Sequence, residues 1–424
     1  MGIEEKLSIG IRGSVNPKHD DPKGLVRGAV LTFRPEEGAT VEFSWRGSFG
    51  RTGKIPLVGA FTGLGNVVMP NAECVFESTG YGDHYVRFRS KKLLSSNDEV
   101  KWKDFGVSEQ MATLTGLMEY VKGTSTRLHF TNDEEFTVHC KNEVVVEGLS
   151  NTCEARYQLR VEVGYSNGAH GRVAVEPNLN LRWTSHTPID FQSAYKSVTA
   201  LQAFFDFVSH EANDNHCVRL SMVDGPAVVV RTAQDIKSPV AHFRRMFEVP
   251  FSLIRSELGT MQASWIAEVH KSQAAQSVLR LLYYARLPVD LRFFIAFGAV
   301  ESAHRDLLMK ASKKGKMKAK QRLLSLSYFW EVMDVGDVSK YVDLLARHRD
   351  ALAHSFASGD LVLTNWRDEG RGFQHLMIIA KAILLERMGL DRSSVLTYVT
   401  TAAGRVKDFL GTHDDGIVPD SDEF

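Results

Sequence analysis

The stretch LLARHRDALAHS, Leu344–Ser355, carries two arginines, two histidines and an aspartate within the eight residues from Arg347 to His354. The leucines and alanines around these charges favour a helix that packs into a core. A helix turns by about 100° per residue, so four of its polar positions fall within about 60° of one another: Asp343, Arg347, Asp350 and His354. This stretch therefore predicts a helix with one buried side and one polar side.

Two charges fall among apolar residues on the predicted helices. Arg349 lies roughly 140° around the helix from His354, on the apolar side. In the upstream segment FFIAFGAVESAHRDLL, Phe293–Leu308, Glu301 falls within the apolar stripe. A buried carboxylate without a partner is costly in free energy. We therefore expect Glu301 and Arg349 to meet between two packed helices, which would orient the arginine toward a phosphate.

Composition limits the classes of protein that this chain can belong to. A chain of 424 residues with 43% hydrophobic residues is long enough for two domains with buried cores. Lys and Arg together number 51, as do Asp and Glu, so an anionic partner must be met by a local patch rather than by a global positive field. The four cysteines show no metal-ligand spacing and fit reduced thiols: Cys74, Cys140, Cys153 and Cys217. We expect no metal and no cofactor.

The ends and the apolar runs of the chain carry no membrane signal. The N-terminal MGIEEKLSIGIRG lacks a basic region followed by an apolar one. The longest apolar runs, such as LMIIAKAILL, are too short to cross a bilayer. We therefore expect a cytoplasmic protein without membrane contact.

The first half of the chain shows the alternation of β-strands. In YQLRVEVGY, Tyr157–Tyr165, apolar and polar residues alternate with a period of two. Asp224-Gly225-Pro226 separates two further apolar runs and predicts a hairpin. One helical insert is expected at Phe191–Val208. Residues 1–235 are therefore predicted to form a β-rich, sandwich-like domain.

After Thr232 the period changes to about 3.6 residues, so the second half is predicted to be helical. We expect a helical linker at 236–288, an all-α bundle at 289–412 and an acidic tail at 413–424, which makes the chain an α+β multidomain protein. The predicted helices are Val240–Phe247, Phe251–Arg286 with a break near Gly259, Pro288–Ala311, Gln321–Val332, Val338–Phe356, Gly372–Met388 and Ser393–Phe409.

Two short motifs on these helices carry a family resemblance. Arg349 and His354 form an R-x4-H motif with a polar residue after the arginine, and Glu301 and Arg305 form an upstream E-x3-R motif. Together they resemble the motifs of HEPN ribonucleases, and a β-rich half before such a bundle resembles the ApeA-type HEPN proteins of bacterial anti-phage defence. The resemblance implies an abortive-infection toxin that cleaves RNA without a metal, with tRNA as a reasonable substrate. It also implies a homodimer or higher homo-oligomer, and an N-terminal domain that either senses a phage-derived trigger or restrains the toxin.

The implied chemistry assigns a role to each motif residue. The ribose 2′-hydroxyl would attack the adjacent phosphate, with His354 moving the proton and Arg349 stabilising the negative charge of the phosphorane-like transition state. Asp350 either holds the imidazole tautomer or is only solvated, and Glu301 either takes a direct part or supports Arg349. Arg347 either contacts a phosphate or only aids solubility.

One basic run offers a local patch for RNA. The segment KASKKGKMKAKQR, residues 310–322, is dense in cations that could bind a polyanion by releasing counterions. Its other interpretation is a solvated, flexible loop. The candidate RNA-binding residues are Lys313, Lys314, Lys316, Lys318 and Lys320, with Arg305 and Arg347.

The sequence also allows two other functions. The bundle could be a non-catalytic HEPN module for interaction or RNA binding, in which Glu301 and Arg349 serve structure only. The β-rich half could instead bind carbohydrate, which would require exposed aromatic residues on one sheet face.

Overall fold

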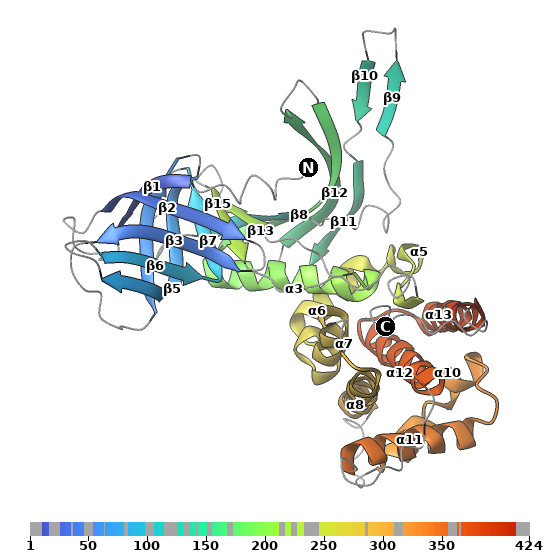
Figure 1. Ribbon diagram of the computed structural model, residues 1–424. Coiled ribbons are helices and arrows are strands. Elements are labelled where there is room, and N and C mark those ends of the chain that lie inside the picture. The colour runs from blue at the N-terminus through green and yellow to red at the C-terminus, as the bar shows by residue number, and fades with distance from the viewer. Residues whose placement is uncertain are drawn as a thin grey trace.

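The computed structural model shows a β-rich half followed by a helical half, as in an α+β protein (Figure 1). The structure describes residues 11–16, 26–34, 37–45, 54–62, 64–79, 84–97, 106–113, 126–130, 136–140, 143–150, 155–167, 173–211, 217–221, 227–232, 246–284, 287–308, 317–354, 363 and 366–412.

Thirteen of the described strands form one antiparallel sheet, in the order β11-β12-β13-β8-β14-β15-β7-β5-β4-β1-β2-β3-β6, and β9 and β10 form a separate pair. The strands are β1 Ile11–Asn16, β2 Val26–Arg34, β3 Gly38–Trp45, β4 Ile55–Phe61, β5 Gly65–Thr79, β6 His84–Ser90, β7 Lys92–Ser96, β8 Gly106–Thr113, β9 Thr126–Phe130, β10 Phe136–Cys140, β11 Glu143–Ser150, β12 Ala155–Asn167, β13 Val173–Asp190, β14 Cys217–Ser221 and β15 Ala227–Thr232.

Strand β5 closes part of this sheet on itself. Its first residues pair with β4 and β7, and its last residues pair with β6, with a register shift between Cys74 and Phe76. Because β6 also pairs with β3, the strands β5, β4, β1, β2, β3 and β6 form a closed ring. Side chains that alternate inward fill the ring, including Phe33, Phe43 and Phe88.

The sandwich-like arrangement expected from the sequence is wrong. Two packed sheets would each bury one face against the other, whereas the main sheet here is continuous and buries apolar side chains by curling. The hairpin predicted around Asp224-Gly225-Pro226 is confirmed by its strands, because β14 and β15 pair in antiparallel fashion. The turn itself lies outside the described residues.

Helix α3, Phe191–Ser209, confirms the helical insert predicted at Phe191–Val208 and connects the two halves. It begins where Asp190 Oδ1 accepts a hydrogen bond from Ser193 N at 3.0 Å. The first part of the helix packs under the sheet beside β8 and β14. Its second part belongs to the core of the helical half, where Trp265 Nε1 donates to Ala200 O at 2.7 Å.

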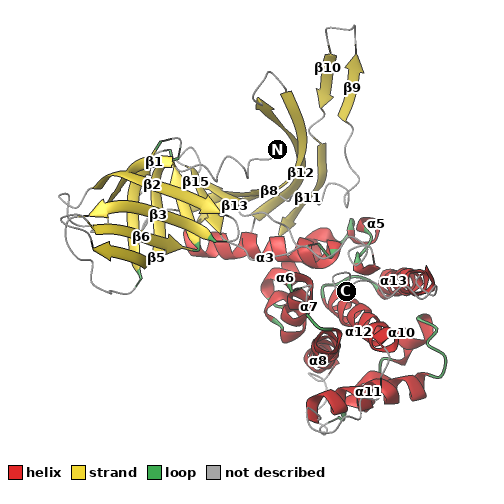
Figure 2. Cartoon of the chain, viewed as in Figure 1, coloured by secondary structure: helices red, strands yellow, loops and turns green. Residues whose placement is uncertain are grey.

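From Phe251 on, the helical half follows the predicted order of helices (Figure 2). Most of the predicted helix Val240–Phe247 lies outside the described residues. The predicted helix 251–286 is divided into three α-helices and one short 3-10 helix, and the predicted helix 321–332 into two α-helices. The elements are α5 Phe251–Ile254, α6 Leu258–Ala267, η2 Val269–Lys271, α7 Gln273–Tyr283, α8 Val289–Leu308, α9 Ala319–Leu324, α10 Ser327–Val332, α11 Val338–His354, α12 Trp366–Arg387 and α13 Arg392–Thr412.

One core joins these helices. The segment 236–288, which the sequence predicts as a linker, contributes α5, α6 and α7 to the same cluster of buried residues as α8 and α10–α13. These three helices therefore pack as part of the bundle. The predicted tail 413–424 lies outside the described residues. Within the described part of the chain, no helix combines the length and apolar character needed to cross a membrane.

Close packing fixes α8 against α11 and α12. A Cβ atom placed on Gly372 of α12 would lie 2.9 Å from Phe293 Cε2 and 3.0 Å from Leu345 Cδ2. Phe293 and Leu345 are fully buried. The absence of a side chain at this position therefore lets the three helices approach, and this packing sets the position of Glu301 on α8 relative to Arg349 on α11.

Candidate active site between α8, α9 and α11

Helix α11 presents one side to the core and the other to the surface. It begins at Val338, where Asp337 Oδ1 accepts a hydrogen bond from Lys340 N at 3.0 Å, and this contact lowers the pKa of Asp337. Its buried residues are Val342, Leu345, Ala346 and His348. Arg349 lies at the border, with 29% of its side chain exposed.

Glu301 and Arg349 meet between the packed helices, as the sequence predicts. Arg349 Nη2 donates to Glu301 Oε2 at 3.1 Å, and only 17% of the Glu301 side chain is exposed. The guanidinium also lies 5.6 Å from the centre of the buried Phe297 ring of α8. Glu301 and Phe297 together hold the arginine in one orientation while leaving part of it open to solvent.

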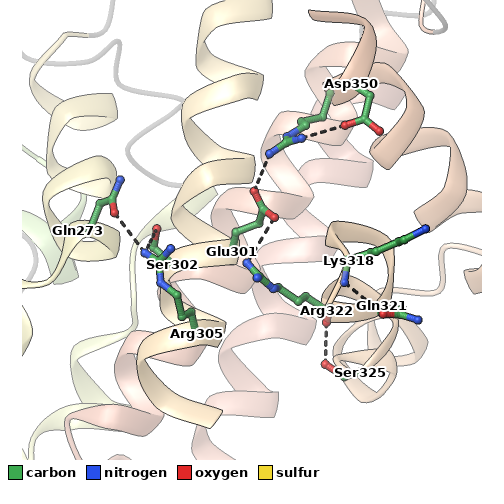
Figure 3. A network of polar contacts seen from close by, with 10 residues as sticks. Gln273, Glu301, Ser302, Arg305, Lys318, Gln321, Arg322, Ser325 and Asp350 are labelled. Atoms are coloured by element: carbon green, nitrogen blue, oxygen red, sulfur yellow. Dashed lines mark hydrogen bonds and ion pairs between the residues drawn. The ribbon is translucent and has the colours of Figure 1, made fainter. Parts of the chain in front are cut away.

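The second carboxylate oxygen of Glu301 forms an ion pair with an arginine of α9. Arg322 Nη1 lies 3.5 Å from Glu301 Oε1, and 17% of the Arg322 side chain is exposed. Figure 3 shows Glu301 between Arg322 and the helix that carries Asp350. Sequence reasoning placed Arg322 only at the end of the lysine-rich run and missed its contact with Glu301. Arg322 lies on α9, which begins at Ala319 within this run, and its partner on α8 depends on how the two helices pack.

Arg305 is turned away from this group. Although it follows Glu301 by one helical turn, its Nη2 donates to Gln273 Oε1 of α7 at 3.3 Å (Figure 3). Ser302 Oγ accepts a second bond from the same nitrogen at 3.5 Å. The E-x3-R motif is therefore split in space, because Glu301 faces α9 and α11 whereas Arg305 faces α7.

Asp350 pairs with Arg349. Arg349 Nη1 donates to Asp350 Oδ1 at 2.8 Å, and 60% of the Asp350 side chain is exposed. His354 is exposed at the last residue of α11, and among the described residues no hydrogen bond joins it to Asp350 or Arg349. Arg347 is likewise exposed. The structure thus brings Glu301, Arg349 and Asp350 together and leaves His354 and Arg347 on the surface.

A buried histidine next to Arg349 anchors α11, and sequence reasoning missed it. His348 is fully buried, and its Nδ1 accepts a hydrogen bond from Leu363 N at 3.2 Å. Because Nδ1 accepts, the ring proton lies on Nε2, which donates to Glu369 Oε1 of α12 at 2.9 Å. The ring also packs edge-on against Phe293 of α8, with 4.8 Å between centroids. His348 therefore ties α11 to α8, to α12 and to Leu363.

A second buried histidine lies behind Arg322. Ser325 Oγ donates to Arg322 O at 2.7 Å, so it accepts from His304 Nε2, which is also 2.7 Å away. Burial, and then the nearby Arg322 guanidinium, lower the pKa of His304. A neutral His304 therefore adds no charge beside Arg322.

The basic run is only partly described. Lys320 of α9 donates to Asp343 Oδ1 of α11 at 2.6 Å, and this bond lowers the pKa of Asp343. Lys318 is exposed just before α9, where its backbone N donates to Gln321 Oε1 at 3.1 Å. Lys313, Lys314 and Lys316 lie outside the described residues. The described part of the run is thus fixed against α11 by α9.

Comparisons of the chain with protein-family models, with curated proteins and with solved structures find no match. Among the described residues, no group of three or more His, Cys, Asp or Glu side chains could hold a metal ion. The candidate site is therefore the cluster of Glu301, Arg349, Arg322 and Asp350 on the helix that also carries the exposed His354 or beside that helix. Such a cluster can bind an anion through arginine donors, and an exposed imidazole can exchange a proton with a ligand.

Proposed function

We propose that the chain is an endoribonuclease of HEPN type that cleaves RNA without a metal ion. In the reaction, the ribose 2′-oxygen forms a bond to the adjacent phosphorus, and the bond from phosphorus to the 5′-oxygen breaks. The products are a 2′,3′-cyclic phosphate and a free 5′-hydroxyl. His354 takes the proton of the 2′-hydroxyl, and water supplies the proton that the leaving 5′-oxygen receives.

The observation that carries this proposal is the state of Arg349. Its guanidinium is held by Glu301 at 3.1 Å and remains 29% exposed. A fixed, permanently charged group with N–H donors facing solvent suits the charge that develops on a phosphate in the transition state. Because it is already oriented, little free energy of reorganisation is spent when the phosphate arrives.

His354 and Arg349 face different directions on α11, so we propose that two copies of the chain complete the site. In a symmetric dimer the same surface of each copy contacts the other, and each α11 can contribute to one shared groove. Such a homodimer follows the arrangement that the HEPN resemblance implies. The polar residues at the C-terminal end of α11 would then line the groove.

We further propose that the β-rich half receives a phage-derived trigger and that the chain acts in abortive infection, with tRNA as the suggested substrate. Helix α3 supports a connection between the halves because it packs under the sheet and also enters the core of the helical half. A change in the sheet could thus reach the helices through one rigid element.

One observation favours a second candidate, a non-catalytic interaction or RNA-binding module. Both terminal nitrogens of Arg349 already contact carboxylates, Nη1 with Asp350 and Nη2 with Glu301. An arginine in this state can serve as a structural ion pair between helices. The two candidates differ in whether RNA is cut.

An RNA cleavage assay in EDTA separates them. Purified wild-type protein, Arg349→Ala and His354→Ala are incubated with total RNA, and the new ends are tested for 2′,3′-cyclic phosphate. We expect cleavage by the wild type and at least a hundredfold loss in each variant. Arg387→Ala is the control, because Arg387 of α12 pairs with Glu268 away from the site. Equal RNA profiles for the wild type and both site variants would support the module.

A further inference from the structure

Glu301 contacts two arginines at once, one through each oxygen of its carboxylate. Oε2 contacts Arg349 at 3.1 Å, and Oε1 faces Arg322 at 3.5 Å. Two guanidiniums around one carboxylate leave a net charge of about +1. The three side chains are 17–29% exposed. Asp350 pairs with Arg349 at 2.8 Å and brings the formal charge of the four side chains to zero. Arg322, 3.5 Å from the shared Glu301, is the less neutralised of the two guanidiniums.

Arg322 has donors that Glu301 does not use. A guanidinium carries five N–H donors, and the contact with Glu301 occupies Nη1 at the long distance of 3.5 Å. Its buried Nε has no hydrogen-bond partner among the described atoms. The neighbouring His304 cannot accept from it through Nε2, because that nitrogen donates to Ser325. The arginine is therefore positioned by one anion and able to contact another.

Arg322, and not the motif residue Arg305, is the second arginine that faces Glu301. Arg305 faces Gln273 on α7, whereas Arg322 faces Glu301 from α9. Helix α9 begins at Ala319, within the lysine-rich run, and is joined to α11 through Lys320 and Asp343. Arg322 and Lys320 therefore lie on the same short helix beside α11.

We propose that Arg322 and Arg349 form a two-guanidinium site for the phosphodiester groups of RNA, with Glu301 as the positioning residue that holds both. The identity of the ligand rests on the proposed function. Each planar guanidinium can present two parallel N–H donors to phosphate oxygens. A bound phosphodiester would place an anion beside two guanidiniums that share one largely buried carboxylate.

Binding of a labelled single-stranded RNA 20-mer tests the site, with all variants made in full-length His354→Ala protein so that RNA stays intact. Arg322→Gln should raise the Kd about tenfold and reduce the slope of log Kobs against log salt by about 0.7. Arg349→Gln should do the same. Arg387→Gln, the matched arginine paired with Glu268, should change neither quantity. A DNA 20-mer should show the same dependence on Arg322, because the site reads phosphodiesters.

An Arg322→Gln protein that melts like its parent and binds with unchanged Kd and slope would overturn the proposal. If that variant does not fold, Arg322→Lys decides: it should keep the slope but bind about threefold to tenfold more weakly, since lysine lacks the planar fork. An unchanged Kd for Arg322→Lys would then reject the site. If RNA binding depends on Arg322 but the wild type cleaves no RNA, the proposed ribonuclease activity is rejected and the proposed anion-binding site is supported.

Discussion

At the scale of single residues, the helix that carries Arg349 is held by its neighbour His348. The ring accepts a hydrogen bond from Leu363 N–H and donates one to the Glu369 carboxylate, so both ring nitrogens have a partner. Only 13% of the Glu369 side chain is exposed. Removal of the ring nitrogens would therefore leave two buried polar groups unpaired.

We expect His348→Phe to lower the free energy of unfolding by about 2–5 kcal/mol, since each unpaired buried group costs about 1–3 kcal/mol. Urea unfolding followed by circular dichroism measures the change. His354→Phe on the exposed end of the same helix is the control and should stay within about 0.5 kcal/mol of the wild type. Equal midpoints for the wild type and His348→Phe would show that the ring does not anchor α11.

The residues of the site were only partly predictable from sequence. The meeting of Glu301 and Arg349 could be predicted, because each is a charge on the apolar side of its own helix. Arg322 and His348 could not, because the sequence offered no pair of charges on apolar helix faces for them. Their contacts with Glu301 and Glu369 depend on how the helices pack. Arg305 follows Glu301 by one turn, yet this spacing did not predict its contact with α7.

At the scale of elements, the helices were more predictable than the sheet. Apolar residues repeat along α8, α11 and α13, and the predicted bounds differ from the observed ones by at most a few residues. The break before α7 has a local cause, since Ser272 Oγ accepts a hydrogen bond from Ala275 N at 3.1 Å. The closure of the β5–β6 ring depends on pairing between distant strands, which alternation alone does not specify.

Helix packing at Gly372 gives a prediction with a matched control. Gly372→Ala should lower the free energy of unfolding by about 1–2 kcal/mol, because the added Cβ would press on fully buried side chains of α8 and α11. Gly404→Ala on α13 meets nothing within 4 Å, so it should raise stability by about 0.5–1 kcal/mol through helix propensity. Thermal unfolding compares the two. Stabilisation by both substitutions would show that α12 can move away from its neighbours without cost.

At the scale of the whole molecule, helix α3 joins the two halves, because its buried residues belong both to the cluster under the sheet and to the core of the helical half. Leu201, Phe204 and Phe205 of this helix lie in the same core cluster as α6, α7 and α12. In the same region, Lys381 of α12 is fully buried and donates to Phe247 O at 2.7 Å. Burial holds the pKa of Lys381 well below its usual value. Stability measured on the full chain therefore reports on α3 and the helices together.

Three buried histidines should make the stability of the folded chain depend on pH. Burial lowers the pKa of His375 to about 3, and it also lowers the pKa of His210 and of His304. The unfolded chain takes up these protons near pH 6.5, whereas the folded chain takes them up only at lower pH. Stability is therefore complete above about pH 6.5 and falls as the pH decreases toward about 3. Each histidine contributes up to about 1.4 kcal/mol per pH unit.

Urea unfolding between pH 5 and pH 7 tests this dependence. His375→Asn keeps an acceptor near Tyr341, whose hydroxyl lies 2.9 Å from His375 Nδ1, and should reduce the slope of stability against pH by about one proton. Asp391→Asn is the control. Hydrogen bonds from Ser393 and Ser394 hold the pKa of Asp391 below its usual value, so its contribution is constant above about pH 4 and lost only at lower pH. The control should shift the midpoint equally at each pH in this range. An unchanged slope in His375→Asn would show that His375 binds its proton as readily in the folded chain as in the unfolded chain.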